Sequence, residues 1–401
     1  MIRIFRALHA FPLILCSLLS GLFISCGQSD TARKIIVVEN LLDLDRSFET
    51  IELTKESLGL DMQDKLENFG IRDRVSQASV TTQYMDSDSD GLADILLFQP
   101  VVDAMATREF ELFGLTSGVK EDTLHACYSR FVPERTDDYA WENNRVAFRT
   151  YGPTAQNLKE EGKPGGTLSS GIDAWLKKID YPIINKWYEK ETTDKGSYHE
   201  DTGEGLDNFH VGASRGIGGT AVKRNAAYYF SKNFTSWRTI ATGPIRTSFI
   251  LDYAGWDAAG NEIKEEKHIS LDYGSNLSKF EISIQGVDTL SVGLTLHEND
   301  GETTINEQEG WLSYWQPHEE SELGSGIVVP GGSLDGYEKY VTEEKDLSNL
   351  YAHIKVKEGK VSYYAGFAWK ESVQYETKEE WVQYLTQFAR RINTPLSITI
   401  K

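Results

Sequence analysis

The sequence contains little cysteine and comparatively little positive charge. Only three cysteines occur among its 401 residues: Cys16, Cys26 and Cys127. A framework of disulfide bridges is therefore excluded, and a large apolar core has to hold the fold together. The chain carries 41 Lys and Arg against 61 Asp and Glu, a formal net charge of −20. Such an acidic chain does not bind nucleic acid or an anionic membrane surface through its general field, so arginines gathered locally must meet any anionic ligand.

Several familiar catalytic signatures are also missing. The sequence has no GxSxG elbow, no HExxH helix and no CxxC pair, which argues against a serine hydrolase, a zinc peptidase and a thiol redox protein. The run GASRGIGG does not predict dinucleotide binding, because no strand-to-helix context surrounds it. Chemistry must therefore be sought among scattered charged and aromatic residues.

The longest apolar run, Phe11–Ile24, is too short to cross a bilayer. Two arginines precede this run and Cys26 follows it, a pattern typical of a secretory signal. We expect residues 1–25 to be a lipoprotein signal peptide, Cys26 to carry the lipid, and residues 26–33 to form a tether. The protein would then be exported to the periplasm or the outer membrane, and would touch the membrane only through its lipid anchor.

Period-two alternation dominates the sequence from Lys34 onward. Examples are KIIVVEN, DILLFQP, RVAFRTYG, TSFILDY, KFEISIQG and KVSYYAGFAWK. Turn residues separate these segments at short intervals, which favours an antiparallel sandwich over a parallel sheet. Helices are expected at Ser170–Glu189, broken or kinked at Pro182, and at Thr377–Ile392, where a threonine can cap the first turn. Residues 34–401 are thus predicted to form one large, mainly β domain, an antiparallel β-sandwich with a few peripheral helices.

Alternating carboxylates predict a metal site in the loop DSDSDGLAD. The spacing is that of a calcium-binding EF-hand loop through its ninth position, but the twelfth position is leucine and a strand follows. We expect a hairpin-type structural calcium site, and the alternative is a solvated acidic turn. No organic cofactor is expected. The proposed metal ligands are Asp86, Asp88, Asp90 and Asp94.

Residues 130–152, RFVPERTDDYAWENNRVAFRTYG, contain four arginines, four carboxylates and one tryptophan. Strand alternation would place Arg145 and Arg149 on one face, where they are costly to bury unless they meet carboxylates or a ligand. Structural salt bridges are the alternative role for these two residues. Arg135 and Trp141, in the expected connecting loop, could supply a guanidinium fork and a sugar-stacking ring.

The glycine-rich segment GSYHEDTGEGLDNFHVGASRGIGG, residues 196–219, holds the densest collection of reactive groups. Tyr198 and His199 are adjacent, Asp207 follows, and Arg215 lies in a glycine run that lets the backbone approach a ligand closely. A Tyr-His pair on a polar loop is not a core position. We therefore expect His199 to act catalytically or to contact a ligand.

Three residues outside these segments are further candidates. Arg246, in GPIR, precedes a strand and would lie at its mouth, where a structural ion pair is the alternative role. His353 and Tyr364 lie in strand-like contexts, where a satisfied core or edge position is the commoner role for a histidine.

Five strings carry a family resemblance: RFVPERTDDYAWEN with AFRTYGP, SGIDAW, YHEDTGEGLDNFHVGASRGIGG, GPIRTSF and YYAGFAWK. They resemble a family of exported Bacteroidota proteins from polysaccharide-utilisation loci, long catalogued as a domain of unknown function, which includes ulvan oligosaccharide dehydratases. The resemblance runs from about Gln83 to the C-terminus. It implies a large antiparallel sandwich related to galactose-mutarotase-like enzymes, and a uronate-containing oligosaccharide, with or without sulfate, as the partner. The matching positions are Arg135, Tyr198, His199 and Arg246.

Dehydration of a terminal uronic acid removes the C5 proton and expels the C4 hydroxyl, giving a 4,5-unsaturated uronyl end. The reaction needs a base, an acid and a cation that stabilises the developing enediolate. We expect His199 to be the base and Tyr198 the acid, although the two roles could be exchanged. The carboxylate clamp would be Arg246 or Arg135. Substrate contacts are expected from Arg215, Trp141, Asp207, His353 and Tyr364.

Other readings remain open. A polysaccharide lyase would use the same proton abstraction but expel a sugar. A surface glycan-binding lipoprotein would rely on Trp141 and other aromatics, and would be indifferent to the loss of His199. A glycoside hydrolase would need a carboxylate pair, for which the sequence offers Glu134, Glu142, Glu200 and Glu204.

Overall fold

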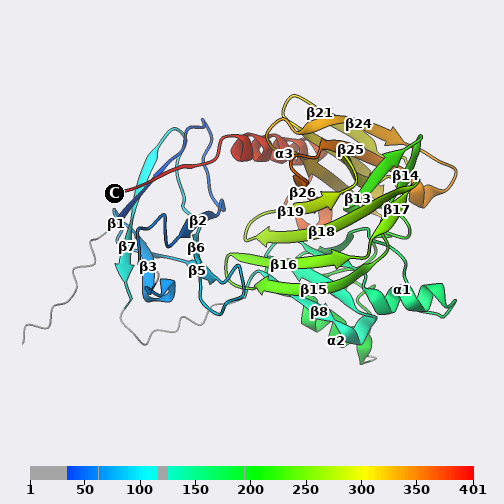
Figure 1. The fold of residues 1–401 in the computed structure, drawn as a ribbon, viewed down its shortest axis with the longest axis horizontal. Coiled ribbons are helices and arrows are strands. Elements are labelled where there is room, and N and C mark those ends of the chain that lie inside the picture. Colours follow the sequence, from blue (N-terminus) through cyan, green and yellow to red (C-terminus); the bar gives the residue numbers. More distant parts are fainter. Residues whose placement is uncertain (1–33, 62, 116–124, 194) are drawn as a thin grey trace, which may run out of the picture. The chain divides into compact units, whose positions relative to one another are not determined.

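The computed structural model describes residues 34–61, 63–115, 125–193 and 195–401 (Figure 1). Residues 34–401 form one compact unit. The predicted signal peptide, the tether and Cys26 lie outside the described residues. Within them the structure is mainly antiparallel β-sheet, as the period-two alternation predicts. No helix in the described ranges is long and apolar enough to cross a membrane.

Two antiparallel sheets face each other across the main hydrophobic core. The larger sheet contains, in spatial order, β15 (Phe234–Ala241), β16 (Arg246–Tyr253), β18 (Asn261–Asp272), β19 (Leu277–Gln285), β26 (Lys360–Trp369), β23 (Ser321–Val328), β22 (Trp311–His318) and β21 (Glu302–Asn306), with β17 (Trp256–Ala258) paired to β18. The smaller sheet contains β14 (Ala227–Tyr229), β13 (Ile217–Arg224), β20 (Thr289–Thr295), β25 (Asn349–Lys355) and β24 (Leu334–Tyr340).

A third sheet covers the same inner face of the larger sheet. Trp141 packs on Phe249 of β16 with ring centroids 5.2 Å apart, and Phe148 packs on Phe367 of β26 at 5.2 Å. The smaller sheet and the third sheet therefore share the task of burying the larger sheet's apolar side. The third sheet contains β12 (Gly205–Leu206), β11 (Asp173–Lys177), β10 (Ala147–Thr150), β9 (Asp138–Glu142) and β8 (Tyr128–Val132).

Strand alternation decides which side chains face outward. In β18, Ile269 and Leu271 enter the main core, so Asp272 points to the opposite side of the larger sheet. In β10, Phe148 enters the main core, so Arg149 points to the opposite side of the third sheet. The larger sheet and the third sheet thus each have an outer face, in addition to that of the smaller sheet. Different candidate residues lie on each face.

The N-terminal strands have a small hydrophobic core of their own, which includes Ile36, Leu53, Leu96 and Phe110. Two sheets enclose it, and the final strand, β27, pairs with the first, β1. One sheet contains β27 (Ser397–Ile400), β1 (Lys34–Glu39), β7 (Thr107–Gly114), β3 (Phe69–Asp73) and β4 (Ser79–Val80). The other contains β2 (Ile51–Thr54), β6 (Ile95–Phe98) and β5 (Thr82–Met85).

One of the two predicted helices is confirmed. Helix α3 spans Lys378–Asn393, and Thr377 forms a capping box with Glu380 at its start. Its buried residues, Trp381 and Leu385 among them, pack against the larger sheet.

The single helix predicted at Ser170–Glu189 is wrong. Its first part is strand β11, in which all five residues are buried, so neighbours on both sides of the third sheet determine the conformation. The helix α2 (Ile184–Thr192) begins only after Pro182 and packs on the outer face of the third sheet. The sequence analysis also missed α1 (Pro153–Glu160), which starts with a proline at its first position after Gly152.

Candidate active site

Tyr198 is anchored by aromatic packing on the outer face of the third sheet. The loop after α2 folds back so that the Tyr198 ring lies 5.1 Å from Trp175 and 6.1 Å from Tyr188, measured between ring centroids. The backbone N–H of Asp207 donates to the Tyr198 carbonyl at 2.8 Å and closes the loop. Tyr198 is buried. This burial fixes the position of its neighbour in sequence, His199.

The Tyr198 hydroxyl accepts two hydrogen bonds from arginines. Arg135 Nε donates at 3.1 Å and Arg149 Nη1 donates at 3.2 Å. No acceptor for the hydroxyl's own proton lies within hydrogen-bond distance among the described residues. Burial raises the pKa of Tyr198, although both guanidinium groups oppose that shift. The group is therefore a protonated phenol whose proton has no acceptor in the described part of the chain. Its side chain is only 1% exposed, so a ligand reaches the hydroxyl only after the side chains that cover it move aside.

Arg149 is surrounded by buried carboxylates. Its Nη2 lies 2.5 Å from Asp173 and 2.8 Å from Asp207, and its Nη1 lies 3.7 Å from Asp138. These carboxylates raise the pKa of Arg149 well above its usual value, against the effect of its burial. Burial raises the pKa of Asp138 to about 6, although Arg149 opposes that shift. The Arg149 charge is thus fully compensated within the protein, and its role is to organise the site.

Arg135 has a different environment. It ends the short 3-10 helix η2 (Pro133–Arg135), and Thr136 and Asp137 follow in left-handed conformations with φ of 51° and 65°. Besides the bond to Tyr198, its guanidinium makes one further hydrogen bond within the described residues, from Nη1 to the Thr136 hydroxyl at 3.2 Å. Within the described residues no carboxylate lies within 4.0 Å of it. Arg135 is therefore a partly buried cation with no carboxylate in direct contact; its burial acts to lower its pKa, but Tyr198 and the nearby Asp138 outweigh that effect and raise it.

His199 lies at the surface beside this group. Its side chain is 54% exposed and its ring centroid lies 4.6 Å from that of Tyr198. The Nδ1 atom bonds the backbone carbonyl of Asp207, whose carboxylate lies 3.8 Å away. A carbonyl can only accept, so Nδ1 carries the hydrogen and the lone pair of the neutral ring is on Nε2. His199 can therefore act as a base toward a bound ligand.

The structure brings four of the predicted residues together: Arg135, Tyr198, His199 and Asp207. Asp207 is buried and pairs with Arg149, so it positions the site from beneath and does not reach a substrate. Sequence reasoning missed Asp138, Asp173 and Tyr188. The only signal for Asp173 is its place directly opposite Arg149 across the β10–β11 pair, which requires the strand register to be known.

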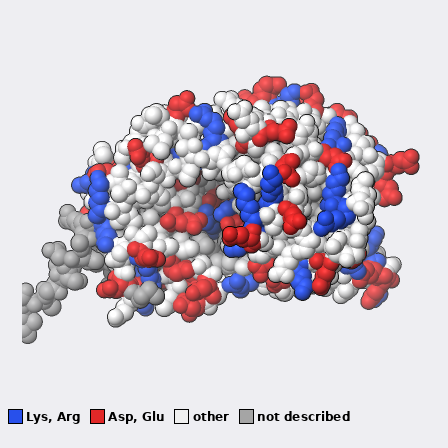
Figure 2. All heavy atoms as spheres, turned by 45° about the horizontal axis from the view of Figure 1, so that its top comes forward, with Lys and Arg blue, Asp and Glu red and all other residues white. Residues whose placement is uncertain are grey.

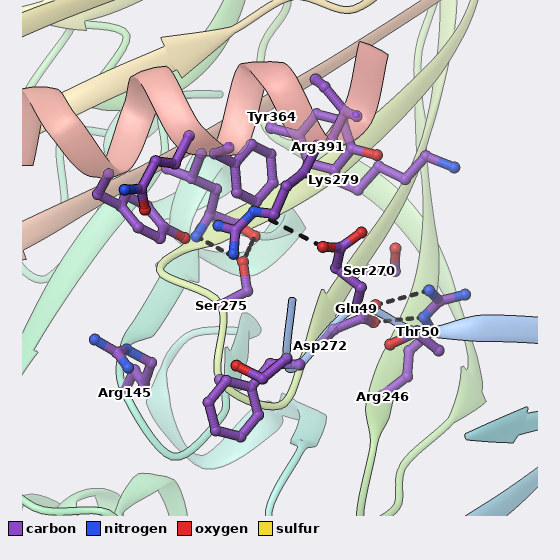
Figure 3. Close-up of a pocket in the computed structure, with 18 of the residues that line it drawn as sticks. Glu49, Thr50, Arg145, Arg246, Ser270, Asp272, Ser275, Lys279, Tyr364 and Arg391 are labelled. Carbon is purple, nitrogen blue, oxygen red and sulfur yellow. Dashed lines mark hydrogen bonds and ion pairs between the residues drawn. The ribbon is translucent and has the colours of Figure 1, made fainter. Parts of the chain in front are cut away.

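Arg246 and Tyr364 lie elsewhere, on the outer face of the larger sheet, where both line a cavity of about 400 Å³ (Figure 3). Arg246 is held by Asp272 at 2.5 and 2.8 Å and by Glu52. No hydrogen bond, ion pair or ring contact in the described part of the chain joins Arg246 to Tyr198 or His199. The choice of Arg246 as part of the same catalytic group is therefore not supported, and Arg135 is the clamp that the geometry favours.

Trp141 and Arg215 cannot contact a ligand as predicted. Trp141 lies in strand β9, is fully buried, and donates from its indole N–H to Ser278 at 3.0 Å. Arg215 is also fully buried, with its guanidinium 3.8 Å from the centre of the Phe230 ring. Both predictions are wrong because the segments around these residues enter the core and do not form surface loops.

His353 is placed away from both groups. It is partly buried in β25 on the smaller sheet, where it bonds Ser291 at 3.0 Å and lies parallel to the Tyr228 ring. Burial lowers the pKa of His353. Its contact with a substrate stays a prediction that this placement does not favour.

Three of the four predicted metal ligands converge. Oxygen atoms of Asp86, Asp88 and Asp90 lie within 4.8 Å of one another, a spacing suitable for a calcium ion. Asp94 is not part of this group, because its carboxylate accepts hydrogen bonds from the Ser87 backbone and hydroxyl. Calcium binding stays a prediction, now with three carboxylate ligands.

Comparisons with known proteins fit this architecture. Residues 38–398 match the family described as "Domain of unknown function (DUF4861)". The "Uncharacterized protein P7" of Formosa agariphila is 57% identical over 381 residues, which cover 95% of this chain and 96% of that protein. A solved structure of a protein in the glycosyl hydrolase family 38 from Enterococcus faecalis aligns with a TM-score of 0.50 and 12% identity over 92% of this chain.

That alignment covers 47% of the Enterococcus protein, so the chain spans about half the length of that solved structure. At this identity the likeness shows a shared fold. The resemblance seen in the sequence is confirmed at the level of the domain of unknown function. With a match over nearly its whole described length, the chain belongs to the DUF4861 family.

Proposed function

We propose that this protein is a hydro-lyase that removes water from the non-reducing-end uronic acid of ulvan-type oligosaccharides and leaves a 4,5-unsaturated uronyl end. One observation carries the proposal. Arg135, a cation without a carboxylate partner, bonds the hydroxyl of Tyr198, a phenol with a free proton, next to the exposed imidazole of His199. The fold shared with a glycosyl hydrolase family protein supports a carbohydrate substrate.

Substrate binding would begin at Arg135. Its Nη2 atom makes no contact in the described part of the chain and can receive the uronate carboxylate. Neutralising that carboxylate makes the C5 proton more acidic, because negative charge moves onto the carboxylate when the proton leaves. The cation thus stabilises the enediolate more strongly than the bound substrate, as catalysis requires.

Proton transfer is then divided between two residues. His199 takes the C5 proton on Nε2, and the C5–H electron pair forms the C4=C5 bond. The C4–O bond breaks and Tyr198 gives its proton to the departing oxygen, so that water leaves. Arg149 and Arg135 both donate to the resulting phenolate. Transfer of the His199 proton back to Tyr198 restores the starting state.

The hydrogen bonding around Tyr198 favours this division of roles over the reverse. Both arginines use the hydroxyl oxygen as an acceptor, which leaves the O–H as a donor toward the ligand. His199 has its Nδ1 proton committed to the Asp207 carbonyl, which leaves Nε2 as an acceptor. Tyr198 is therefore assigned as the acid and His199 as the base.

Mass spectrometry of a defined uronate-terminated ulvan oligosaccharide tests the proposal. Loss of one water at constant chain length, with ultraviolet absorbance of the new double bond, is the expected result. Tyr198→Phe should abolish it, whereas Tyr181→Phe, which alters an exposed tyrosine in the loop before α2, should not. Shorter unsaturated fragments would show a lyase, and an unchanged oligosaccharide would refute the dehydratase assignment.

We also propose that this activity takes place outside the cytoplasm, because the N-terminal pattern ending at Cys26 is that of a lipoprotein signal. Metabolic labelling with a radioactive fatty acid, compared between the native chain and Cys26→Ser, would test the anchor.

A further inference from the structure

The cavity of about 400 Å³ on the outer face of the larger sheet contains charges that the proposed reaction does not use. Its walls come from β16, β18, β19 and β26, from α3, and from residues 47–52 of the N-terminal part (Figure 3). The volume is typical of a small-molecule site. In this chain of net charge −20 the cavity gathers four cations against three carboxylates. The cations are Arg145, Arg246, Lys279 and Arg391, and the carboxylates are Glu49, Glu52 and Asp272.

Two of these four cations are paired within the protein. Arg246 forms a two-point contact with Asp272 at 2.5 and 2.8 Å and a further contact with Glu52. Lys279 lies 3.0 Å from Glu281. These groups need no ligand to balance their charge.

Arg391 is poorly paired. It lies on α3 and points toward Glu49, but the closest nitrogen-to-oxygen distance is 3.9 Å (Figure 3). Glu49 is already bound by Arg46, whose Nε donates to it at 2.6 Å. One carboxylate is therefore shared by two guanidinium groups, and the Arg391 side chain is only 17% exposed.

Arg145 lacks a carboxylate altogether in the described ranges. Its Nε donates to Asn276 at 2.6 Å and Gln374 at 3.1 Å, and its Nη2 reaches the Tyr375 hydroxyl at 3.5 Å. These neutral partners fix the guanidinium but do not balance its charge. A partly buried cation in this position is costly unless an anion meets it.

The remaining wall suits a sugar ring. Tyr364 and Tyr384 each pack against Phe388, with ring centroids 5.0 and 5.8 Å apart, and present an aromatic surface to the cavity. Ser270, Ser275 and Thr50 add hydroxyl groups. Figure 2 shows acidic and basic side chains interspersed on the face of the molecule that it displays.

We propose that this cavity binds an anionic sugar residue, whose carboxylate or sulfate ester contacts Arg391 and Arg145 while its ring lies on the aromatic wall. Carboxylate and sulfate share the chemistry that a guanidinium recognises. The site lies on the opposite outer face from Tyr198 and does not depend on the proposed reaction.

Calorimetry can isolate this cavity from the Tyr198 site. The full chain carrying Arg135→Gln, which removes the proposed clamp for the uronate, is titrated with glucuronate and separately with glucose 6-sulfate. Binding of at least one ligand at one site per chain, weakened by added salt, is expected. Binding of only glucuronate or only glucose 6-sulfate identifies the preferred anion, and binding of neither refutes the proposal.

Adding Arg391→Gln should raise Kd by roughly tenfold or more, because a charge-assisted contact is lost. The matched control is Arg390→Gln. Arg390 is the neighbouring arginine on α3, pairs with Asp43 and does not line the cavity, so its loss should leave Kd within about twofold. Equal effects of the two substitutions would overturn the assignment.

The Kd of Arg145→Gln is measured in the same way, and circular dichroism confirms that this variant is folded. A folded variant with unchanged Kd would also contradict the proposal. Turnover of the uronate oligosaccharide by the native chain is measured separately. Absence of turnover with cavity binding intact would refute only the dehydratase, and the reverse pattern would refute only the cavity.

Discussion

The outer faces of the larger sheet and of the third sheet each gather arginines but neutralise them differently. On the third sheet, Arg149 meets three carboxylates and its neighbour Arg135 meets none. On the outer face of the larger sheet, Arg246 meets two carboxylates. Arg145, from the turn between β9 and β10, and Arg391, from α3, have none to themselves among the described residues. In both places the fully paired guanidinium organises structure, and the poorly paired ones are partly buried. The pairing of an arginine, more than its presence, is therefore the feature on which both proposals rest.

Replacing the paired arginine of the third sheet should have the largest effect. Arg149→Met leaves buried carboxylates without their cation and should lower the free energy of unfolding by about 3 to 5 kcal/mol. Arg135→Met removes a cation with no carboxylate partner and should change it by less than about 1 kcal/mol. Urea denaturation measures both values. If the two substitutions lowered the free energy of unfolding equally, the distinction between paired and unpaired arginines would be wrong.

Replacing the base should affect turnover without affecting stability. His199→Gln removes the proton acceptor and should lower kcat by about 100-fold or more, while the unfolding midpoint stays unchanged. His210→Gln is the control. His210 is exposed, lies in the same connection between α2 and β13, and its ring pairs with the Asp346 carboxylate. A His199→Gln variant with native turnover would remove His199 from the proposed mechanism.

A buried cation in the interior of the sandwich contrasts with the arginines of the outer faces. Lys267 is fully buried, its nearest carboxylate, Glu265, is 3.9 Å away, and its amine has no hydrogen-bond partner in the described residues. Burial lowers the pKa of Lys267 to about 8 from its usual 10.5, although Glu265 opposes that shift. Because no ligand can reach this poorly paired amine, its burial makes it lose its proton more easily.

This shift has a defined sign in the pH dependence of stability. Between pH 8 and pH 10.5 the unfolded chain holds the Lys267 proton and the folded chain does not, so the free energy of unfolding should increase with pH in that interval. Lys267→Met should show a smaller increase, whatever its absolute stability. Denaturation curves at several pH values test this, and identical slopes for both proteins would contradict the lowered pKa.

The loop at Asp86–Asp90 is the opposite case. Three carboxylates lie together there, and none of them forms an ion pair with a Lys or Arg among the described residues. Calcium at about ten times its Kd should stabilise the protein by about 1.4 kcal/mol, and a chelator should remove the gain. Asp88→Asn should weaken the response to calcium. Asp94→Asn should retain it, because Asp94 is turned toward Ser87. Thermal denaturation with and without calcium measures this stabilisation. If calcium does not raise the melting temperature of the native protein, the loop is a solvated acidic turn and not a calcium site.

Much of the fold was predictable because period-two alternation follows directly from strand geometry. The Tyr198-His199 pair was also identifiable, because two reactive side chains are adjacent in a polar, glycine-rich loop. Arg135 was a candidate because of its guanidinium group, its expected place in a connecting loop and its match to the family resemblance. What alternation does not give is the order of strands in each sheet. The position of Arg246 on the opposite outer face from Tyr198 depends on that order, so the sequence could not separate them.

The wrong prediction for Trp141 follows from assigning its segment to a loop and not to a strand. Trp141 was expected in a connecting loop, but only a tight turn with Thr136 and Asp137 in left-handed conformations separates η2 from β9. The strand therefore starts at Asp138, and alternation carries Trp141 into the core. For Arg215, the glycine run resembled a surface loop, whereas β13 begins two residues later and draws the side chain inward.

The pairing of β27 with β1 has a consequence for biogenesis. Strand β1 lies between β7 and β27, so the N-terminal sheet lacks one neighbour until residues near 400 have been synthesised. During translation, β1 would present an unpaired edge until β27 is made, and an unpaired strand edge is a known route to aggregation. Strand β27 covers this edge of β1 and becomes the outermost strand of the sheet.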